Sequence, residues 1–352
     1  MLRIVLLSAS ILVVALFGAP GVVGAEGVVE GAVVNKTGGE SPVKGQEVEL
    51  KALRQDGSTV ATLVTRTDNS GKFRFASLAT ADSSTYVLST KFQDVEYQAS
   101  LKGSEVTEST GKAEIVVYDA ANDVGVQVDL SHLVVEVDPA TSDLTVLEVA
   151  IIQNPSDRTL VPKVRNGQTL WFPLPKGALH PEVTEGLDRV ADPNKGVEGL
   201  GYAGSVLPGK RQVVYTYMLA NPGASFNVSK QMAYPTRKVN VLMADVGQKM
   251  SGPKLSSQQP VNIKDRAYLF LTGESLEAGQ SVEVNVSNFP PPSAPGRGTG
   301  STDQVRWAVL AVMAAGGLAM VLAYPRVRAS RQAALRRARA SHQRHTSLLN
   351  QR

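Results

Sequence analysis

Histidine and acidic residues come close together twice in this chain, which is the first requirement for zinc chemistry. A zinc peptidase needs a His-x-x-Glu pair and a distant histidine, because zinc takes three protein ligands and keeps one open position. His132 precedes Glu136 by four residues, and His180 precedes Glu182 by two. Neither spacing fits, so we interpret His132 as a strand residue and His180 as a loop residue. We predict no metal site.

Serine and lysine also recur at a catalytic spacing. Ser41-Pro42-Val43-Lys44 and Ser251-Gly252-Pro253-Lys254 fit S-x-x-K, and Lys36-Thr37-Gly38 fits K-T-G. In penicillin-binding enzymes the serine and lysine lie one turn apart on a helix. Both matches contain proline, and K-T-G precedes the first serine in an expected β loop. We therefore predict no catalytic residue, no cofactor and no enzyme activity.

Two further side-chain groups suggest ligand binding. Asp68, Asn69 and Ser70 carry oxygen ligands for calcium, but an EF-hand loop needs alternate acidic positions and a later glutamate, so a plain turn is favoured. Sugar binding needs exposed aromatic rings. Trp171 is expected at a buried or edge position, which leaves Tyr202 and Tyr234 as the ring candidates. The ligand-binding residues stay unknown.

The N-terminus has the order of a signal peptide. Arg3 is followed by an uncharged run from Ile4 to Phe17, which at 14 residues is short for a membrane crossing. Small side chains at Val23 and Ala25 suit a signal peptidase. We predict a signal peptide over residues 1–25 and a mature start at Glu26, with an uncleaved anchor as the alternative.

The C-terminus is expected to cross a membrane once. From Trp307 to Tyr324 the chain has 18 consecutive residues without a charge, and the run begins and ends with an aromatic residue. We predict a transmembrane helix over 305–324. Residues 325–352 contain eight arginines and no acidic residue, so the positive-inside rule places this tail in the cytoplasm and the N-terminal domains outside, in the periplasm or at the cell surface.

The tail and the span imply two kinds of contact. All 32 acidic residues lie before the span, so the net charge of +4 hides a tail with surplus positive charge. Anionic lipid headgroups are the expected partner of the tail, with a nucleic-acid partner as the disfavoured alternative. The arginines assigned to the membrane surface are Arg326, Arg328, Arg331, Arg336, Arg337 and Arg339.

Small residues recur within the span at an interval that suits close helix packing. They are Ala311, Ala315, Ala319 and Gly316. Such a stripe lets two helices approach closely, which favours a homodimer or a larger membrane partner, and an alanine-rich span without a partner is the equal alternative. Cysteine is absent, which excludes thiolate metal sites and a thiol nucleophile.

Alternating hydrophobicity identifies strands between the two ends. Val48, Leu50 and Ala52 alternate with charged residues, and Phe73 and Phe75 do the same. Val95-Glu96-Tyr97-Gln98-Ala99 repeats the pattern. The Asp56-Gly57 and Asp68-Gly71 links carry turn residues. This pattern predicts an all-β protein whose first domain, residues 26–121, is a sandwich of about seven strands.

The same stretch resembles a known family. The residues that carry the resemblance are Val29-Glu30-Gly31-Ala32-Val33-Val34-Asn35, Pro42, Val48-Glu49-Leu50, Thr67-Asp68-Asn69-Ser70-Gly71-Lys72-Phe73-Arg74-Phe75, Leu78 and Tyr86. They are similar to the carboxypeptidase regulatory-like family. The resemblance implies a transthyretin-like, carbohydrate-binding-like β-sandwich with an accessory role outside the cytoplasm, and it implies no peptidase activity.

A second, larger β-sandwich region is expected over residues 122–289, as one domain or two. Its predicted strands are Val124–Leu130, Leu144–Ile152, Thr169–Leu174, Gln212–Leu219, Lys238–Ala244, Ala267–Leu271 and Ser281–Val286. The Leu276–Gln280 turn is expected to close a hairpin with the last strand. Residues 290–304, rich in Pro, Gly and Ser, form a predicted stalk.

These observations favour a non-enzymatic, membrane-tethered protein of bacterial type, which binds or scaffolds another protein outside the cytoplasm through its β-sandwich edges and loops. Two alternatives stay open. One is an assembly factor for a membrane complex that acts through the transmembrane helix and the basic tail. The other is a protein that binds a glycan of the cell envelope.

Overall fold

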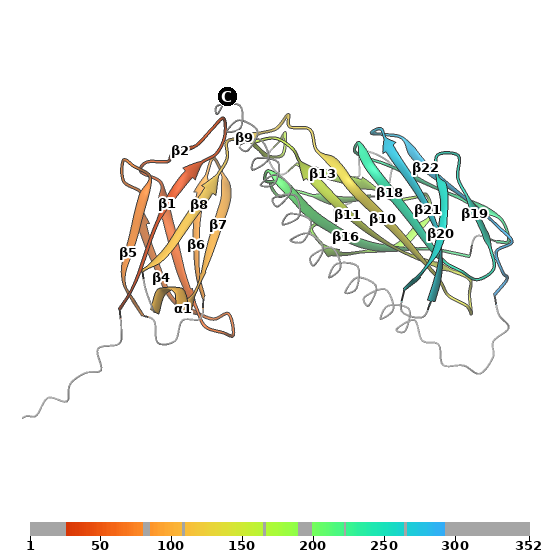
Figure 1. The fold of residues 1–352 in the computed structure, drawn as a ribbon, viewed down its shortest axis with the longest axis horizontal. Helices are drawn as coiled ribbons and strands as arrows, with labels where there is room; N and C mark the ends of the chain where they lie inside the picture. Colours follow the sequence, from red (N-terminus) through yellow and green to blue (C-terminus); the bar gives the residue numbers. More distant parts are fainter. Residues whose placement is uncertain are drawn as a thin grey trace, which may run out of the picture. The chain divides into compact units, whose positions relative to one another are not determined.

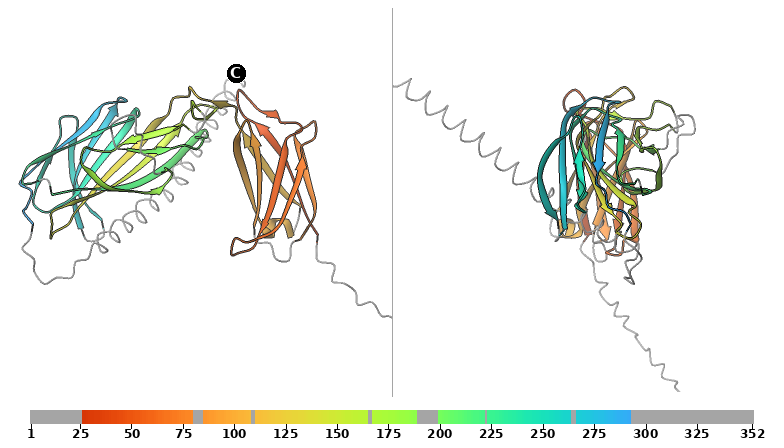
Figure 2. Two further views of the ribbon diagram at one scale, coloured as in Figure 1. Left: turned by 180° about the vertical axis from the view of Figure 1, so that it is seen from behind. Right: turned by 90° about the vertical axis from the view of Figure 1, so that its right-hand side faces the viewer.

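The computed structural model describes residues 26–79, 85–107, 110–164, 167–188, 199–221, 223–263 and 266–292. It is all-β, with several separate sheets (Figure 1, Figure 2). The chain divides into two compact units, Met1–Ala120 and Ala121–Arg352. The predicted signal peptide, transmembrane helix and tail lie outside the described residues, as does the predicted stalk beyond residue 292.

The first unit contains two four-stranded sheets. In one sheet β1 is flanked by β5 and by the parallel strand β8, and β2 pairs with the end of β1. The other sheet has the order β4-β3-β6-β7. The strands are β1 (Glu26–Asn35), β2 (Ser41–Pro42), β3 (Glu47–Leu53), β4 (Thr59–Arg66), β5 (Lys72–Ala79), β6 (Thr85–Phe92), β7 (Val95–Lys102) and β8 (Gly111–Val117).

Both sheets of the first unit contribute to its apolar interior. Val29 and Phe75 come from one sheet, Leu50 and Leu88 from the other, and each is at most 4% exposed. This packing follows from the alternation along the strands, since every second side chain points to the same face. Seven of the strands described in this unit have seven residues or more, which agrees with the predicted number, and β2 is a two-residue addition.

Gly31 and Gly71 have structural roles in the first unit. A Cβ atom on Gly31 would lie 2.2 Å from the carbonyl oxygen of Ala113 and 2.4 Å from the Phe73 ring. Gly71 has a φ of +73°, which most side chains avoid, and its amide closes the turn on the Asp68 carbonyl at 3.0 Å.

A seven-stranded sheet forms the main layer of the second unit. Its order is β14-β16-β11-β10-β18-β21-β20, antiparallel except between β10 and β18. The strands are β10 (Gln127–Val137), β11 (Leu144–Asn154), β14 (Ala178–Glu185), β16 (Gly209–Leu219), β18 (Thr236–Ala244), β20 (Ser256–Ile263) and β21 (Arg266–Leu276).

Smaller sheets complete the second unit. A three-stranded sheet has the order β17-β22-β19, and β13 pairs with β15. The strands are β9 (Ala120–Ala121), β12 (Thr159–Leu160), β13 (Leu170–Pro173), β15 (Gly199–Tyr202), β17 (Phe226–Gln231), β19 (Lys249–Ser251) and β22 (Ser281–Ser287). Inward residues of β22, such as Val282 and Val284, join the same apolar core as Tyr215 and Leu271 of the large sheet.

Two predictions about the strands of the second unit are wrong. The strand expected to end at Leu130 is β10, which continues to Val137, because Leu133–Val137 are all buried and a strand buried on both faces does not alternate. The expected closing hairpin is not formed. β21 and β22 follow each other through Leu276–Gln280, but they belong to different sheets, since β22 pairs with β17 and β19.

Helix is nearly absent from the described residues. The one described helix, α1, covers Gly103–Thr107. Within the described ranges, no helix has the length and apolar character needed to cross a membrane.

Candidate functional site

The structure places the two histidines far from any catalytic arrangement. His132 lies on β10, where burial, helped by the nearby charge of Lys238, lowers the pKa of its imidazole below the ordinary 6.5. His180 was expected in a loop, but it lies within β14 with a φ of +49°, next to a bulge in the pairing with β16. Among the described residues, no three histidine or acidic side chains are grouped as metal ligands would be.

The serine and calcium motifs have structural roles. Ser41 belongs to the two-residue strand β2 and Ser251 ends β19, so neither lies on the helix that S-x-x-K chemistry requires. The Asp68 carboxylate accepts hydrogen bonds from the amides of Ser70 at 2.8 Å and Lys72 at 2.9 Å. The preferred interpretation of Asp68 to Ser70 as a turn is therefore confirmed.

The aromatic candidates are held by neighbours. The Trp171 ring covers Gly199, the guanidinium of Arg211 lies 4.0 Å from the centre of the Tyr202 ring, and the Tyr234 hydroxyl accepts a hydrogen bond from the Trp171 amide at 2.8 Å. Trp171, Tyr202 and Tyr234 are all half-buried. These rings pack against the second unit and do not form an exposed stacking platform.

A buried ionic cluster connects the sheets of the second unit. Glu148 on β11 accepts hydrogen bonds from the hydroxyls of Tyr215 and, at 2.9 Å, Tyr217 on β16. The Lys230 amine on β17 lies 3.0 Å from the Glu148 carboxylate and donates to the carbonyl of Pro173 at 2.7 Å. The Lys230 and Glu148 side chains are 4% and 2% exposed.

The ionic cluster has a structural function. Burial raises the pKa of the Tyr215 and Tyr217 phenols well above their ordinary value, and the Glu148 charge raises it further, so both phenols stay neutral donors. The Lys230 amine also donates to the Tyr215 hydroxyl at 3.1 Å, so the carboxylate has three donors and the amine three acceptors, as a buried charge pair requires. By binding Pro173, Lys230 fixes β17 relative to the chain that enters the Pro175–Gly177 turn.

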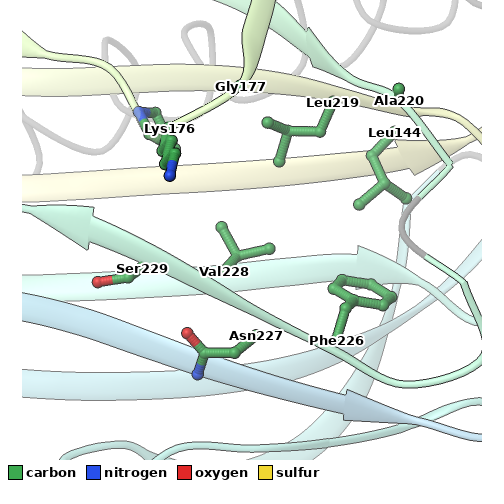
Figure 3. Close-up of a pocket in the computed structure, with 10 residues that line it drawn as sticks. Leu144, Lys176, Gly177, Leu219, Ala220, Phe226, Asn227, Val228 and Ser229 are labelled. Atoms are coloured by element: carbon green, nitrogen blue, oxygen red, sulfur yellow. The ribbon is translucent and has the colours of Figure 1, made fainter. Parts of the chain in front are cut away.

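A groove lies between β17 and the Pro175–Gly177 turn (Figure 3), so the contact of Lys230 with Pro173 affects the distance between the groove walls. Its volume is about 390 Å³. The lining residues are Leu144, Pro175, Lys176, Gly177, Leu219, Ala220, Phe226, Asn227, Val228 and Ser229. Figure 3 shows the side chains of Leu144, Leu219, Val228, Phe226 and Lys176 around this groove.

One wall of the groove is an unpaired strand edge. β17 is the terminal strand of its sheet and pairs on one side with β22, so among the described strands none covers its other side. Phe226 and Val228 are half-buried, whereas Asn227 and Ser229 are exposed. The groove thus offers backbone hydrogen-bonding groups beside an apolar floor, a combination suited to an extended peptide.

The sequence did not indicate this groove. β17 was missed because Lys230 occupies an inward position, which weakens the hydrophobic alternation of Phe226–Gln231. The assigned arginines and the small residues of the span lie outside the described residues. We take the groove as the candidate binding site.

Comparisons with known proteins assign no family to this chain. No family model matches the chain, and no curated protein matches it in sequence. Among solved structures, 47% of the chain aligns with 43% of an M1 zinc metallopeptidase from Deinococcus radiodurans, at 10% identity and a TM-score of 0.29. The chain thus spans less than half of that enzyme, and a likeness this weak supports no argument about fold or activity.

Proposed function

We propose that this protein is a non-enzymatic, membrane-tethered binding or scaffolding protein, which holds an extended segment of another protein in the groove beside β17. The observation that carries the proposal is the unpaired edge of β17 next to an apolar floor. A segment added to this edge would form backbone hydrogen bonds with β17 and place alternate side chains in the groove.

The lining residues specify the segment. Leu219 and Phe226 favour one or two apolar side chains at alternate positions, and Lys176 favours an acidic residue beyond them. Lys230 and Glu148 hold the groove walls at a fixed separation, so the site needs little reorganisation on binding. Sequence resemblance to the carboxypeptidase regulatory-like family agrees with an accessory role outside the cytoplasm.

Site-specific photo-crosslinking in intact cells tests the proposal. A photoreactive amino acid replaces Ser229, which lines the groove, or Ser257, which is exposed on β20. The full-length protein with the probe at 229 is expected to form a discrete adduct with one partner, and the protein with the probe at 257 is not. Adducts of equal yield from both positions, or none from 229, would overturn the groove as the binding site.

A matched pair of substitutions identifies the role of the apolar floor. Val228→Arg places a charge in the groove and is expected to lower the yield of the 229 adduct at least tenfold. Val261→Arg changes a half-buried valine on another terminal strand, β20, and is expected to leave the yield unchanged. Export and protease resistance of both variants establish that they fold.

The two alternatives predict different results. If the protein is an assembly factor that acts through its span and basic tail, the partner is lost when the tail is removed and is retained in Val228→Arg. If the partner is a glycan, replacement of Tyr202 or Tyr234 abolishes binding and the groove variants do not. The predicted contact of the arginine-rich tail with lipid is compatible with each of these functions.

A further inference from the structure

The chain enters and leaves the second unit at opposite ends of strand β11. The Val161 amide donates a hydrogen bond to the carbonyl of Ala121, the first residue of the unit, at 2.8 Å. The side chain of Asn154, the last residue of β11, donates to the Arg158 carbonyl at 2.8 Å. Both contacts flank β12, which pairs with β9. The entry therefore lies at the Asn154 end of β11.

The exit of the chain lies at the other end of β11. The Phe289 amide donates to the Ala224 carbonyl at 3.0 Å, and the Phe289 ring meets the Phe226 ring edge-on, with 5.3 Å between their centres. The Ser142 hydroxyl, two residues before β11 begins, donates to the Pro290 carbonyl at 3.3 Å. Phe289 is 3% exposed, so these contacts fix the chain where it leaves the unit.

The groove beside β17 lies at this exit. Leu144, the first residue of β11, pairs with Leu219, the last residue of β16, and both line the groove. Phe226, which packs against Phe289, lines it as well. Since β11 has 11 residues, the groove lies about 34 Å from the entry, at about 3.4 Å per residue.

The length of the chain limits the distance from the groove to the membrane. The structure describes the chain up to residue 292, and the predicted membrane span begins at residue 305. The 12 residues between them, 293–304, can extend over at most about 43 Å, at about 3.6 Å each. A partner must therefore present its bound segment within about this distance of the membrane.

We propose that the groove receives an extended segment next to a transmembrane helix of a second protein in the same membrane. This inference rests on the proposed function and adds which part of the partner is bound. The segment has one or two apolar side chains at alternate positions and an acidic residue for Lys176. A groove of about 390 Å³ accepts few side chains, so it binds weakly alone. Confinement of both proteins to one membrane raises their effective concentration, so weak binding suffices.

Lengthening the chain between the second unit and the span tests this inference. Eight EAAAK repeats inserted between Ser301 and Thr302 add up to about 60 Å, because such spacers are largely helical, with a rise of about 1.5 Å per residue. With the photoreactive amino acid in place of Ser229, the lengthened full-length protein is expected to give about tenfold less adduct than the natural chain. The matched control has the same spacer between Arg331 and Gln332, beyond the predicted span, and should give an unchanged yield.

The adduct also identifies the bound segment of the partner. Mass spectrometry is expected to locate the crosslinked residue within about 12 residues of a transmembrane segment, the length that bridges about 43 Å. A soluble partner, a crosslink far from the membrane, or an undiminished adduct with the spacer after Ser301 would overturn this inference and leave the groove as the binding site. Absence of any adduct from the natural chain would overturn the proposed function, and this inference with it.

Energy transfer to the membrane tests the position of the groove without a partner. Lys176→Cys lies at the groove, and Leu207→Cys lies just before β16, at the opposite end of the sheet. Each gives the full-length protein a single site for a donor dye, because the chain contains no cysteine. In phosphatidylcholine vesicles with an acceptor dye on the headgroups, transfer from 176 is expected to be about twofold more efficient, since the two ends lie about 34 Å apart. Equal transfer from both positions, or more from 207, would overturn the inference.

Discussion

The two units of this protein differ in the polar side chains that they bury. Among the described residues, the buried polar side chains of the first unit are two threonines, whereas the second unit buries Asp129, Glu136, Glu148 and Lys230. At the sheet edges, β14 and β20 contain proline and have register shifts in their pairing, whereas β4 contains no proline and has one register shift. Buried charges demand particular partners, so they fix how the sheets of the second unit pack.

This contrast explains why the candidate binding groove lies in the second unit. In the second unit, the ionic cluster of Glu148, Tyr215, Tyr217 and Lys230 holds a groove open beside one unprotected strand, β17. In the first unit, none of the described buried side chains is charged, so its interior contains no such cluster.

The largest expected effect comes from the buried ion pair. Lys230→Met leaves the Glu148 charge without its cation, which should lower the free energy of unfolding of the second unit by about 3–5 kcal/mol. Urea unfolding followed by the fluorescence of Trp171, with Trp307 replaced by Phe, measures this change. The Lys230→Met, Glu148→Gln double variant should recover part of the loss, and no difference between single and double variants would contradict the account.

Gly31 offers the corresponding test in the first unit. Gly31→Ala places a methyl group against the Ala113 carbonyl and the Phe73 ring, which should cost about 1–3 kcal/mol. Gly125→Ala, which lies in the second unit and has open space around it, is the control and is expected to leave the first unit unchanged. Limited proteolysis of the first unit measures the difference. Equal protease resistance in both variants would show that the close approach at Gly31 is unimportant.

Removal of an edge proline should have a smaller effect, which is a gain in self-association. Pro260→Thr gives β20 the amide that the proline lacks, so the large sheet is expected to gain weak self-association. Gln259→Thr changes a neighbouring exposed residue and is the control. Sedimentation at increasing concentration distinguishes the two. Identical behaviour would show that the proline does not protect this edge.

The smallest expected effect is a pH dependence from His132. Because the pKa of His132 is lowered in the folded protein, the unfolded chain binds more protons than the folded one below about pH 6.5. Stability is therefore fully present above that pH and falls as the pH drops toward the folded pKa. His132→Gln should remove this contribution from the urea unfolding curves between pH 7 and pH 5. An unchanged pH dependence in the variant would mean that His132 does not contribute to it.

The sequence predicted those strands that bury only one face. Alternation located β3, β5 and β7 and the two turns around Gly57 and Gly71, because those strands have one face in the core. It failed for β10, which is buried on both faces, and for β4, in which every residue is half-buried or exposed. In neither case does the burial of successive residues alternate cleanly.

Sequence patterns could not predict the candidate site. Glu148 and Lys230 are 82 residues apart, and charged residues inside a strand resemble solvent-facing ones until their partners are known. The groove combines the end of the β11–β16 pair, a turn and β17, so its residues are distant in sequence. Only the assembled sheets bring them together.

The measurement that tests the central claim most directly is photo-crosslinking from position 229 in two forms of the protein, the full-length chain and a chain truncated a few residues after Tyr324. The account predicts the same adduct, in similar yield, from both forms, because the β domains bind the partner. Loss of the adduct on truncation would contradict the account and would assign binding to the membrane span and the basic tail.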